Sequence, residues 1–359
     1  MARRTLYVAI TNHGFGHATR ATSVAATVKR LAPEVDIILA TKAPRWLLES
    51  YLDAPFTLRE MAVDVGVLQP DSLTMDKVGT LAALQNIRQQ QTALIEQEAA
   101  FLQAANVDLV LGDIPPLMAR AAKAAKLPCW MMSNFGWDFI YRPWGGDFIE
   151  MADWIADCFQ QCDRLFRLPF HEPMAAFPHI TDVGLTGGHP RHSADELRSR
   201  FKITAPQEKT ILLTFGGLGL AQIPYEGLKA FSDWQFMTFD RQAPDLPNLC
   251  KVTDQRLRPV DLMPLCSRIV SKPGFSTFSE ACRLDLPIVT VTRECFAEGP
   301  VLVAGLQQHN YHQVLSPDEL FGGDWTFLQE DPEPPRSEKR LGKNGNEDIA
   351  GAIIDFLNP

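Results

Sequence analysis

Two histidines and two glycines lie close together near the start of the sequence, in HGFGHATR at 13–20. An imidazole can act as a base near neutral pH, so His13 and His17 are both candidates for a catalytic base. Gly14 and Gly16 lack side chains and would let a substrate approach the backbone, where a following helix offers free N–H groups to an anion. Metal binding is one alternative for the histidines, although no third ligand is apparent nearby, and a structural hydrogen bond to the backbone is another.

A glycine-rich turn between a strand and a helix also occurs in dinucleotide-binding sites, which gives this loop a further alternative. Such a site requires G-x-G-x-x-G and an acidic residue at the end of the second strand. Here Thr19 stands at the third glycine position, and Thr41 and Lys42 follow the second apolar run. Both departures argue against a nicotinamide or flavin site, and we expect no bound cofactor.

Asp113 is the last residue of the apolar run VDLVLGD, which has the character of a buried strand. If this strand belongs to the same parallel sheet as the run before His13, its carboxylate lies at the same sheet edge as the histidine loop. A carboxylate in that position can orient an imidazole and stabilise its protonated form. The alternative is structural, because Asp113 could cap the helix predicted after Pro115 and Pro116.

A second turn between a strand and a helix is found in SKPGFSTFSEA at 271–281. Ser276, Thr277 and the amide groups of the helix start would form a cradle for a diphosphate, to which Lys272 can add a positive charge. Glu280, one turn into the helix, could accept hydrogen bonds from ribose hydroxyl groups. The alternative is a capping box from Thr277 to Glu280, in which the glutamate only satisfies a backbone donor.

Two weaker signals lie elsewhere in the second half of the chain. The glycines of TFGGLG at 214–219, Gly216 and Gly217, follow a predicted strand and would allow close approach to a phosphate. Glu298 follows the predicted strand PIVTVTR and completes the candidates for donor binding.

An aromatic cluster, SNFGWDFIYRPW at 133–144, follows a predicted strand of the first half. An aromatic ring beside a polar group is a good platform for a sugar, so Asn134, Trp137 and Asp138 are candidates for acceptor binding. We expect most of the cluster to serve packing.

Apolar strand-like runs alternate with helical patterns through both halves of the chain. The first half contains TLYVAI, VDIILAT, VDLVLGD and PCWMMSN, and the second contains KTILLTFGG, WQFMTF, RIVSKPG and PIVTVTR. This alternation predicts right-handed crossovers and parallel sheets. We therefore expect an α/β protein with two Rossmann-like, doubly wound domains whose strand ends face a cleft.

A change of composition separates the two halves. The segment GLTGGHPRHSADELRSRFKITAPQ is rich in glycine, proline and charge, which is typical of a linker. We predict one Rossmann-like domain over 1–182, a linker over 183–206 and a second Rossmann-like domain over 207–345. We expect the remaining residues, 346–359, to form a helix that packs back on the first domain.

Composition limits the class of partner. The net charge of −9 opposes binding to nucleic acid, which requires many basic contacts. No apolar run approaches the roughly 18 residues of a membrane span, so we expect a cytoplasmic protein without a transmembrane segment, with peripheral membrane contact left open. The seven cysteines are scattered, and only Cys158 and Cys162 are close in sequence, so we expect reduced thiols and no metal site.

Together, HGFGHATR, VLGDIPP, SNFGWDFIY and SKPGFSTFSEA resemble the glycosyltransferase-like region that precedes the kinase domain in plant arabinokinases, and its stand-alone bacterial relatives. The chain is similar, more distantly, to the N-acetylglucosaminyltransferase of lipid II synthesis. The likeness runs from about residue 5 to 315 and is specific for the set of motifs rather than for any one of them. It implies a GT-B fold, with an N-terminal acceptor domain and a C-terminal donor domain. No glycine- and serine-rich ATP loop of the sugar-kinase type occurs, so we expect no kinase half in this sequence.

The resemblance also implies roles for individual residues. From the lipid II enzyme it implies that the turn from Gly274 through Phe275 to Thr277 holds the diphosphate and that Glu280 binds the ribose. From inverting plant glycosyltransferases it implies that His17 is the base, with Asp113 behind it. The sequence departs from these patterns by the extra His13 and by Lys272-Pro273 in the phosphate turn.

We therefore expect a glycosyltransferase of the hexosyl- or pentosyltransferase class. It would move a sugar from a nucleotide diphosphate sugar, with a UDP-sugar as the first candidate, to a hydroxyl group of an unidentified acceptor. Direct displacement with His17 as base would invert the anomeric centre, and the absence of a D-x-D motif predicts a metal-independent reaction. The alternatives are a nucleotide-sugar 2-epimerase, which shares the fold, and a non-catalytic nucleotide-sugar-binding protein.

Overall fold

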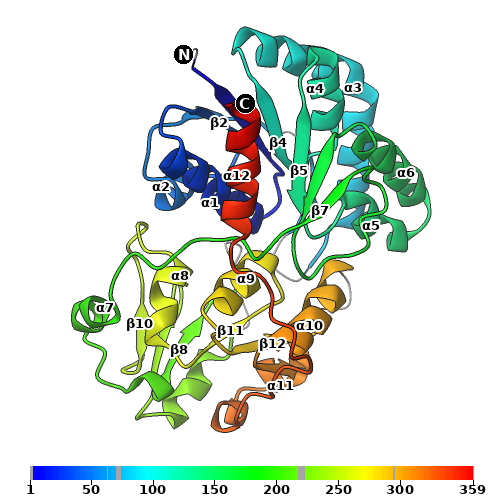
Figure 1. Ribbon diagram of the computed structural model, residues 1–359. Helices are drawn as coiled ribbons and strands as arrows, with labels where there is room; N and C mark the ends of the chain where they lie inside the picture. Colours follow the sequence, from blue (N-terminus) through cyan, green and yellow to red (C-terminus); the bar gives the residue numbers. More distant parts are fainter. Residues whose placement is uncertain (1–2, 63, 70–73, 217–222, 294–295, 359) are drawn as a thin grey trace. The chain divides into compact units, whose positions relative to one another are not determined.

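The computed structural model describes residues 3–62, 64–69, 74–216, 223–293 and 296–358. The chain divides into two compact units (Figure 1). Unit 1 contains the chain up to Gly187 together with the C-terminal segment from Gly342, and unit 2 runs from Gly188 to Leu341. The segment expected to be a linker contains helix α7, which belongs to unit 2.

Unit 1 is built on a seven-stranded parallel sheet with the order β3-β2-β1-β4-β5-β6-β7. Its strands are β1 (Thr5–Ile10), β2 (Asp36–Ala40), β3 (Thr57–Arg59), β4 (Leu109–Asp113), β5 (Cys129–Ser133), β6 (Arg164–Arg167) and β7 (Ile180–Asp182). Its helices are α1 (Gly16–Leu31), α2 (Arg45–Tyr51), α3 (Lys77–Ala104), α4 (Leu117–Ala125), α5 (Trp137–Tyr141), the 3-10 helix η1 (Arg142–Trp144), α6 (Asp147–Phe159) and α12 (Gly345–Leu357).

The strand order of unit 1 reverses between β1 and β4, where ligands of open parallel sheets bind. Every residue of β1, β4 and β5 is buried, which explains why these strands appear as continuous apolar runs in the sequence. Ile10, the last residue of β1, pairs with Asp113, the last residue of β4. The loop after β1 and the carboxylate of Asp113 therefore meet at one edge of the sheet.

The C-terminal helix α12 packs against α1 within unit 1 (Figure 1). At its start, the side chain of Asn346 accepts a hydrogen bond from the N–H of Gly187 at 3.1 Å and donates one to its carbonyl oxygen at 2.8 Å. Arg30 near the end of α1 forms an exposed ion pair with Glu347 at 3.2 Å. These contacts hold the end of the chain on the first unit.

Unit 2 is built on a six-stranded parallel sheet with the order β10-β9-β8-β11-β12-β13. Its strands are β8 (Thr210–Leu213), β9 (Gln235–Thr238), β10 (Leu249–Lys251), β11 (Arg268–Ser271), β12 (Ile288–Val291) and β13 (His312–Leu315). Its helices are α7 (Ala194–Phe201), η2 (Gln207–Lys209), η3 (Tyr225–Ala230), α8 (Pro259–Leu262), η4 (Met263–Leu265), α9 (Phe275–Arg283), α10 (Glu298–His309), α11 (Pro317–Phe321) and η5 (Thr326–Gln329).

The strand order of unit 2 reverses between β8 and β11. The glycine turn after β8 and the turn after β11 thus start at the same edge of the sheet, where the order reverses. One face of this sheet packs on a core that includes Phe236, Leu228 and the fully buried Trp325. The prediction of two Rossmann-like, doubly wound parallel sheets is confirmed.

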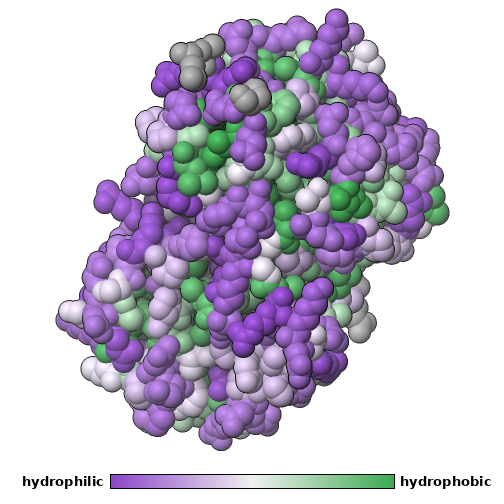
Figure 2. All heavy atoms as spheres, in the orientation of Figure 1, coloured by the Kyte–Doolittle hydropathy of each residue, from purple (hydrophilic) through white to green (hydrophobic). Residues whose placement is uncertain are grey.

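Hydrophilic residues predominate on the face of the molecule drawn in Figure 2, with smaller hydrophobic patches between them. Among the described residues, no helix combines the length and hydropathy needed to cross a bilayer. The six described cysteines are free thiols, and Cys295 lies outside the described residues.

Candidate functional site

His17 lies in the first turn of α1, at the carboxyl edge of the sheet of unit 1. Its Nδ1 is 2.8 Å from Oδ1 of Asp113, and both side chains are buried, with exposed fractions of 6% and 0%. The alternative of Asp113 as a helix cap is wrong, because the N-cap residue of α4 is Pro116 and the carboxylate of Asp113 contacts His17 and Arg20 instead. The structure thus brings the expected base and carboxylate into contact, and their catalytic roles stay predictions.

Arg20 completes this cluster and was missed by sequence reasoning. Its Nε donates to Oδ2 of Asp113 at 2.7 Å and its Nη2 donates to Oδ1 at 2.6 Å, which makes a bidentate pair. Burial alone would raise the pKa of Asp113, but the positive charge of Arg20 and the hydrogen bonds from Arg20 and His17 bring that pKa below its usual value. The available signal was spacing, because Arg20 lies three residues after His17 and therefore on the same helix face.

A second buried carboxylate, Asp64, was also missed. It accepts hydrogen bonds from the hydroxyl of Thr11 and from the N–H of Asn12, the latter at 2.8 Å. Burial raises the pKa of Asp64, and the hydrogen bonds from Thr11 and Asn12 oppose this rise in part. Asp64 lies in a polar loop without a motif, so no pattern in the sequence marked it.

The other residues of the histidine loop have different surroundings. The Nδ1 of His13 lies 3.2 Å from both the N and the O of Val67, and its ring packs edge-on against Trp137 with the centroids 5.2 Å apart. These backbone contacts match the structural alternative for His13, and its catalytic role stays a prediction. Gly14 has a φ of +59°, which favours glycine, and Gly16 is the first residue of α1.

Two of the three candidates for acceptor binding, Asn134 and Trp137, lie next to the His17 cluster. Asn134 accepts a hydrogen bond from Nη1 of Arg20 at 2.7 Å, and Trp137 donates from Nε1 to the hydroxyl of Thr11 at 3.1 Å. Both are almost fully buried. Asp138 lies in the first turn of α5, where burial raises the pKa of its carboxyl group. In this structure Asn134 and Trp137 support the cluster, and contact of the three residues with an acceptor stays a prediction.

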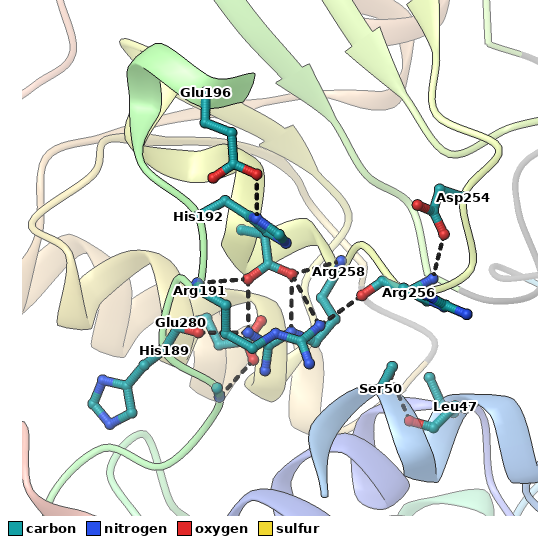
Figure 3. A network of polar contacts seen from close by, with 12 residues as sticks. Leu47, Ser50, His189, Arg191, His192, Glu196, Asp254, Arg256, Arg258 and Glu280 are labelled. Atoms are coloured by element: carbon teal, nitrogen blue, oxygen red, sulfur yellow. Dashed lines mark hydrogen bonds and ion pairs between the residues drawn. The ribbon is translucent and has the colours of Figure 1, made fainter. Parts of the chain in front are cut away.

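In unit 2, helix α9 begins at Phe275, with Gly274 as its N-cap residue and Ser276 and Thr277 in its first turn. The capping-box alternative for Glu280 is wrong, because the helix starts before Thr277 and Glu280 lies within it. Instead, the buried Oε1 of Glu280 accepts a hydrogen bond from the N–H of Gly188 at 2.8 Å (Figure 3).

Buried charges hold the segment that begins at Gly188 on unit 2 (Figure 3). Arg283 donates to the carbonyl oxygen of Gly188 at 3.0 Å, and Arg258 donates to that of His189 at 2.5 Å. Arg258 also pairs with the fully buried Asp261, whose Oδ1 accepts from the N–H of Arg191 at 3.0 Å. Glu280 is therefore part of a buried polar network next to the donor-binding candidates of α9.

Cationic side chains lie at the ends of β11 and β12. Burial lowers the pKa of Lys272 to about 8, the positive charge of Arg293 acts in the same direction, and Glu298 opposes both. A Cβ atom at Gly216, whose φ is +81°, would lie 3.2 Å from Cε of Lys272, so a glycine leaves room for this side chain. Gly217 lies outside the described residues. Arg293 was missed, although the run PIVTVTR ends with it.

This edge of unit 2 has the chemistry of an anion site. It combines Lys272, the buried Arg293 and the amide groups at the start of α9 and α10. Positive charge and the backbone N–H groups of a helix start together bind phosphate oxygens. Among the described residues, no group of three or more His, Cys, Asp or Glu side chains is arranged to hold a metal ion.

No protein-family model matches the chain. It is 30% identical to L-arabinokinase of Arabidopsis thaliana over 356 residues, which cover 96% of this chain and 33% of that protein. The chain thus spans about a third of the length of this relative. The match agrees with the resemblance stated from the motifs.

Solved structures of glycosyltransferases share the fold. CalG4, the calicheamicin glycosyltransferase, has a TM-score of 0.63 at 15% identity, with 99% of each chain covered. Phytolacca americana UGT2, complexed with UDP-2fluoro-glucose and pterostilbene, has a TM-score of 0.58 at 12% identity, with 99% of this chain and 90% of that chain covered. A putative UDP-N-acetylglucosamine 2-epimerase from Listeria monocytogenes has a TM-score of 0.58 at 11% identity, with 99% and 96% covered. The predicted GT-B fold is confirmed.

Proposed function

We propose that the chain is a glycosyltransferase that moves a sugar from a nucleotide diphosphate sugar to a hydroxyl group of an acceptor. The observation that carries the proposal is the contact of 2.8 Å between Nδ1 of His17 and Oδ1 of Asp113 at the switch point of a GT-B sheet. A buried imidazole held by a carboxylate is the arrangement that general-base catalysis requires.

In the proposed reaction, His17 takes the proton of the acceptor hydroxyl group. The oxygen then forms a bond to the anomeric carbon, and the bond from this carbon to the diphosphate breaks with its electron pair on the diphosphate. The carboxylate of Asp113 stabilises the imidazolium ion that forms. This displacement inverts the anomeric centre, and the base contributes about 10² to 10⁴ in rate.

Unit 2 supplies the second requirement, which is stabilisation of the departing diphosphate. We assign the binding of this diphosphate to Lys272, Arg293 and the start of α9, which combine positive charge with backbone N–H groups within unit 2. Fixed donors of this kind stabilise developing negative charge without reorganisation. Two side-chain cations beside a helix start support the proposal of a reaction that needs no metal ion, and we assign ribose binding to Glu280.

The donor to test first is a UDP-sugar, because UGT2 binds UDP-2fluoro-glucose on a similar fold. The epimerase from Listeria monocytogenes favours a second candidate function, the 2-epimerisation of a nucleotide sugar. The two reactions differ in their need for an acceptor. Epimerisation gives an altered nucleotide sugar in the absence of any alcohol, whereas transfer gives a free nucleotide diphosphate and a glycoside.

The test has two steps. Thermal-shift measurements with UDP-, GDP-, dTDP- and ADP-sugars identify the donor. Mass spectrometry then follows glycoside formation with and without a panel of alcohols, and proton NMR of the nucleotide sugar, which distinguishes epimers of equal mass, follows epimerisation. We expect one class of nucleotide sugar to stabilise the chain and a glycoside to appear only with an alcohol. Binding without any turnover would indicate a non-catalytic binding protein, and an epimer formed without alcohol would indicate an epimerase.

A further inference from the structure

Two groups of opposite hydrogen-bonding character contact the same ring nitrogen of His17. Its Nδ1 lies 2.8 Å from Oδ1 of Asp113 and 2.9 Å from Nη2 of Arg20. An ionised carboxylate only accepts hydrogen bonds, and a guanidinium group only donates them. The first contact needs a hydrogen atom on Nδ1 and the second needs a lone pair, so only one of them is a hydrogen bond. The choice decides which ring nitrogen can act as a base.

The hydrogen atoms of Arg20 already have oxygen acceptors on the side that faces His17. Nη2 carries two hydrogen atoms. One is donated to Oδ1 of Asp113 at 2.6 Å, and the other points to Oγ of Ser133 at 3.1 Å. Nε donates to Oδ2 of Asp113 and Nη1 donates to Asn134, each at 2.7 Å. With this set of bonds, Nη2 has no hydrogen atom left for His17.

The opposite assignment has two costs. If Nη2 donated to Nδ1 of His17, Oγ of Ser133 would lose this donor. The lone pair of Nδ1 would also face Oδ1 of Asp113 at 2.8 Å without a hydrogen atom between them. Repulsion between a lone pair and a carboxylate is strong inside a protein, and both side chains are buried. The balance of hydrogen bonds therefore favours a hydrogen atom on Nδ1.

We propose that Arg20 and Ser133 are positioning residues that hold His17 in the tautomer with hydrogen on Nδ1, leaving the lone pair on Nε2. Arg20 neutralises Asp113 and occupies it on both oxygens, and Ser133, the last residue of β5, occupies the second hydrogen atom of Nη2. Ser133 acts through Arg20. The catalytic consequence rests on the proposed function, since Nε2 is then the atom that takes the proton of the acceptor.

The tautomer can be observed by NMR in the full chain labelled with ¹⁵N-histidine. Two-bond ¹H–¹⁵N spectra distinguish a protonated ring nitrogen from one with a lone pair, and His17→Gln identifies the signals. Ser133→Ala removes the acceptor of the second Nη2 hydrogen atom. Thr22→Val is the matched control, because the hydroxyl of Thr22 is buried on α1 and has no hydrogen-bond partner among the described residues.

We expect His17 to carry hydrogen on Nδ1 in the wild type and in Thr22→Val. In Ser133→Ala the second Nη2 hydrogen atom loses its oxygen acceptor, and Nδ1 of His17, 2.9 Å from Nη2, is the acceptor left beside it, so the population with hydrogen on Nε2 should rise at least severalfold. A wild-type spectrum with hydrogen on Nε2 overturns the proposal by itself, including the case in which Ser133→Ala fails to fold. A folded Ser133→Ala with the wild-type tautomer overturns the role of Ser133.

Activity gives a second readout that separates this inference from the proposed function. If sugar transfer is correct, Ser133→Ala lowers kcat by at least about tenfold. A general base contributes about 10² to 10⁴ to the rate, and the variant loses only part of this contribution because some His17 keeps the reactive tautomer. Thr22→Val keeps the wild-type rate. The expected tautomers together with no turnover in the wild type would refute the proposed function and leave the tautomer assignment intact.

Discussion

Lys272 is expected to affect stability and nucleotide binding in opposite directions. Burial and the neighbouring Arg293 lower its pKa from 10.5 to about 8. The unfolded chain therefore binds more protons than the folded chain between about pH 8 and 10.5, and stability rises with pH in this window. Below about pH 8 the ammonium group is charged in both states, and its burial lowers the free energy of unfolding by the full amount. At 1.36 kcal/mol per pKa unit, this destabilisation is at most about 3.4 kcal/mol.

Lys272→Met keeps the apolar stem of the side chain and removes its charge. We expect the free energy of unfolding to increase by about 1 to 3 kcal/mol at pH 7, and its rise between pH 8 and 10.5 to disappear. We expect the affinity for UDP to fall about ten- to a hundredfold, because a hydrogen bond to a charged group contributes about 1.5 to 3 kcal/mol. Urea unfolding at several pH values and titration calorimetry measure the two effects.

Lys229→Met is the matched control for this experiment. Lys229 lies on η3 of unit 2, and its side chain is 58% exposed and paired with Glu226. Its replacement should change neither the pH dependence of stability nor the affinity for UDP. A Lys272→Met variant that is less stable than the wild type at pH 7 and binds UDP with unchanged affinity would refute the reasoning.

Three further predictions concern the proposed chemistry. Asp113→Asn leaves the charge of the buried Arg20 without its ionised partner, so urea unfolding should show a decrease of about 3 to 5 kcal/mol in the free energy of unfolding. A decrease below about 1 kcal/mol would contradict a stabilising role for this ion pair. Glu280→Ala should abolish a preference for UDP over 2′-deoxy-UDP in calorimetry, and a preserved preference would mean that another group binds the ribose. Turnover should be unchanged by EDTA, because side-chain cations are proposed to stabilise the diphosphate, and a requirement for Mg²⁺ would rule this out.

The sheets and the pairing of His17 with Asp113 were predictable for one physical reason. The central strands are buried on both faces and appear as uninterrupted apolar runs, so their ends can be located in the sequence. Parallel strands end at the same edge, and both residues are near such ends. The geometry of parallel sheets then brings the two side chains together.

Other parts of the site depend on details that the sequence does not specify. The spacing of Arg20 places it near His17. Whether its guanidinium group pairs with Asp113 or extends into solvent depends on how closely α1 packs on the sheet. The burial of Asp64 is compensated by hydrogen bonds from the hydroxyl of Thr11 and the N–H of Asn12, which follow β1. A contact of this kind leaves no periodic pattern in the sequence. The interpretation of Glu280 as a cap failed because α9 starts at Phe275, and helix ends are set by local backbone geometry.

The most direct test of the account compares turnover and donor binding in His17→Ala. The imidazole is proposed to act only as the base, and the donor is proposed to bind to residues of unit 2. With the donor and acceptor identified by the screen, we predict a fall in kcat of about 10² to 10⁴ and a Kd for the nucleotide sugar within about twofold of the wild type. A His17→Ala variant that retains wild-type kcat would contradict the central claim.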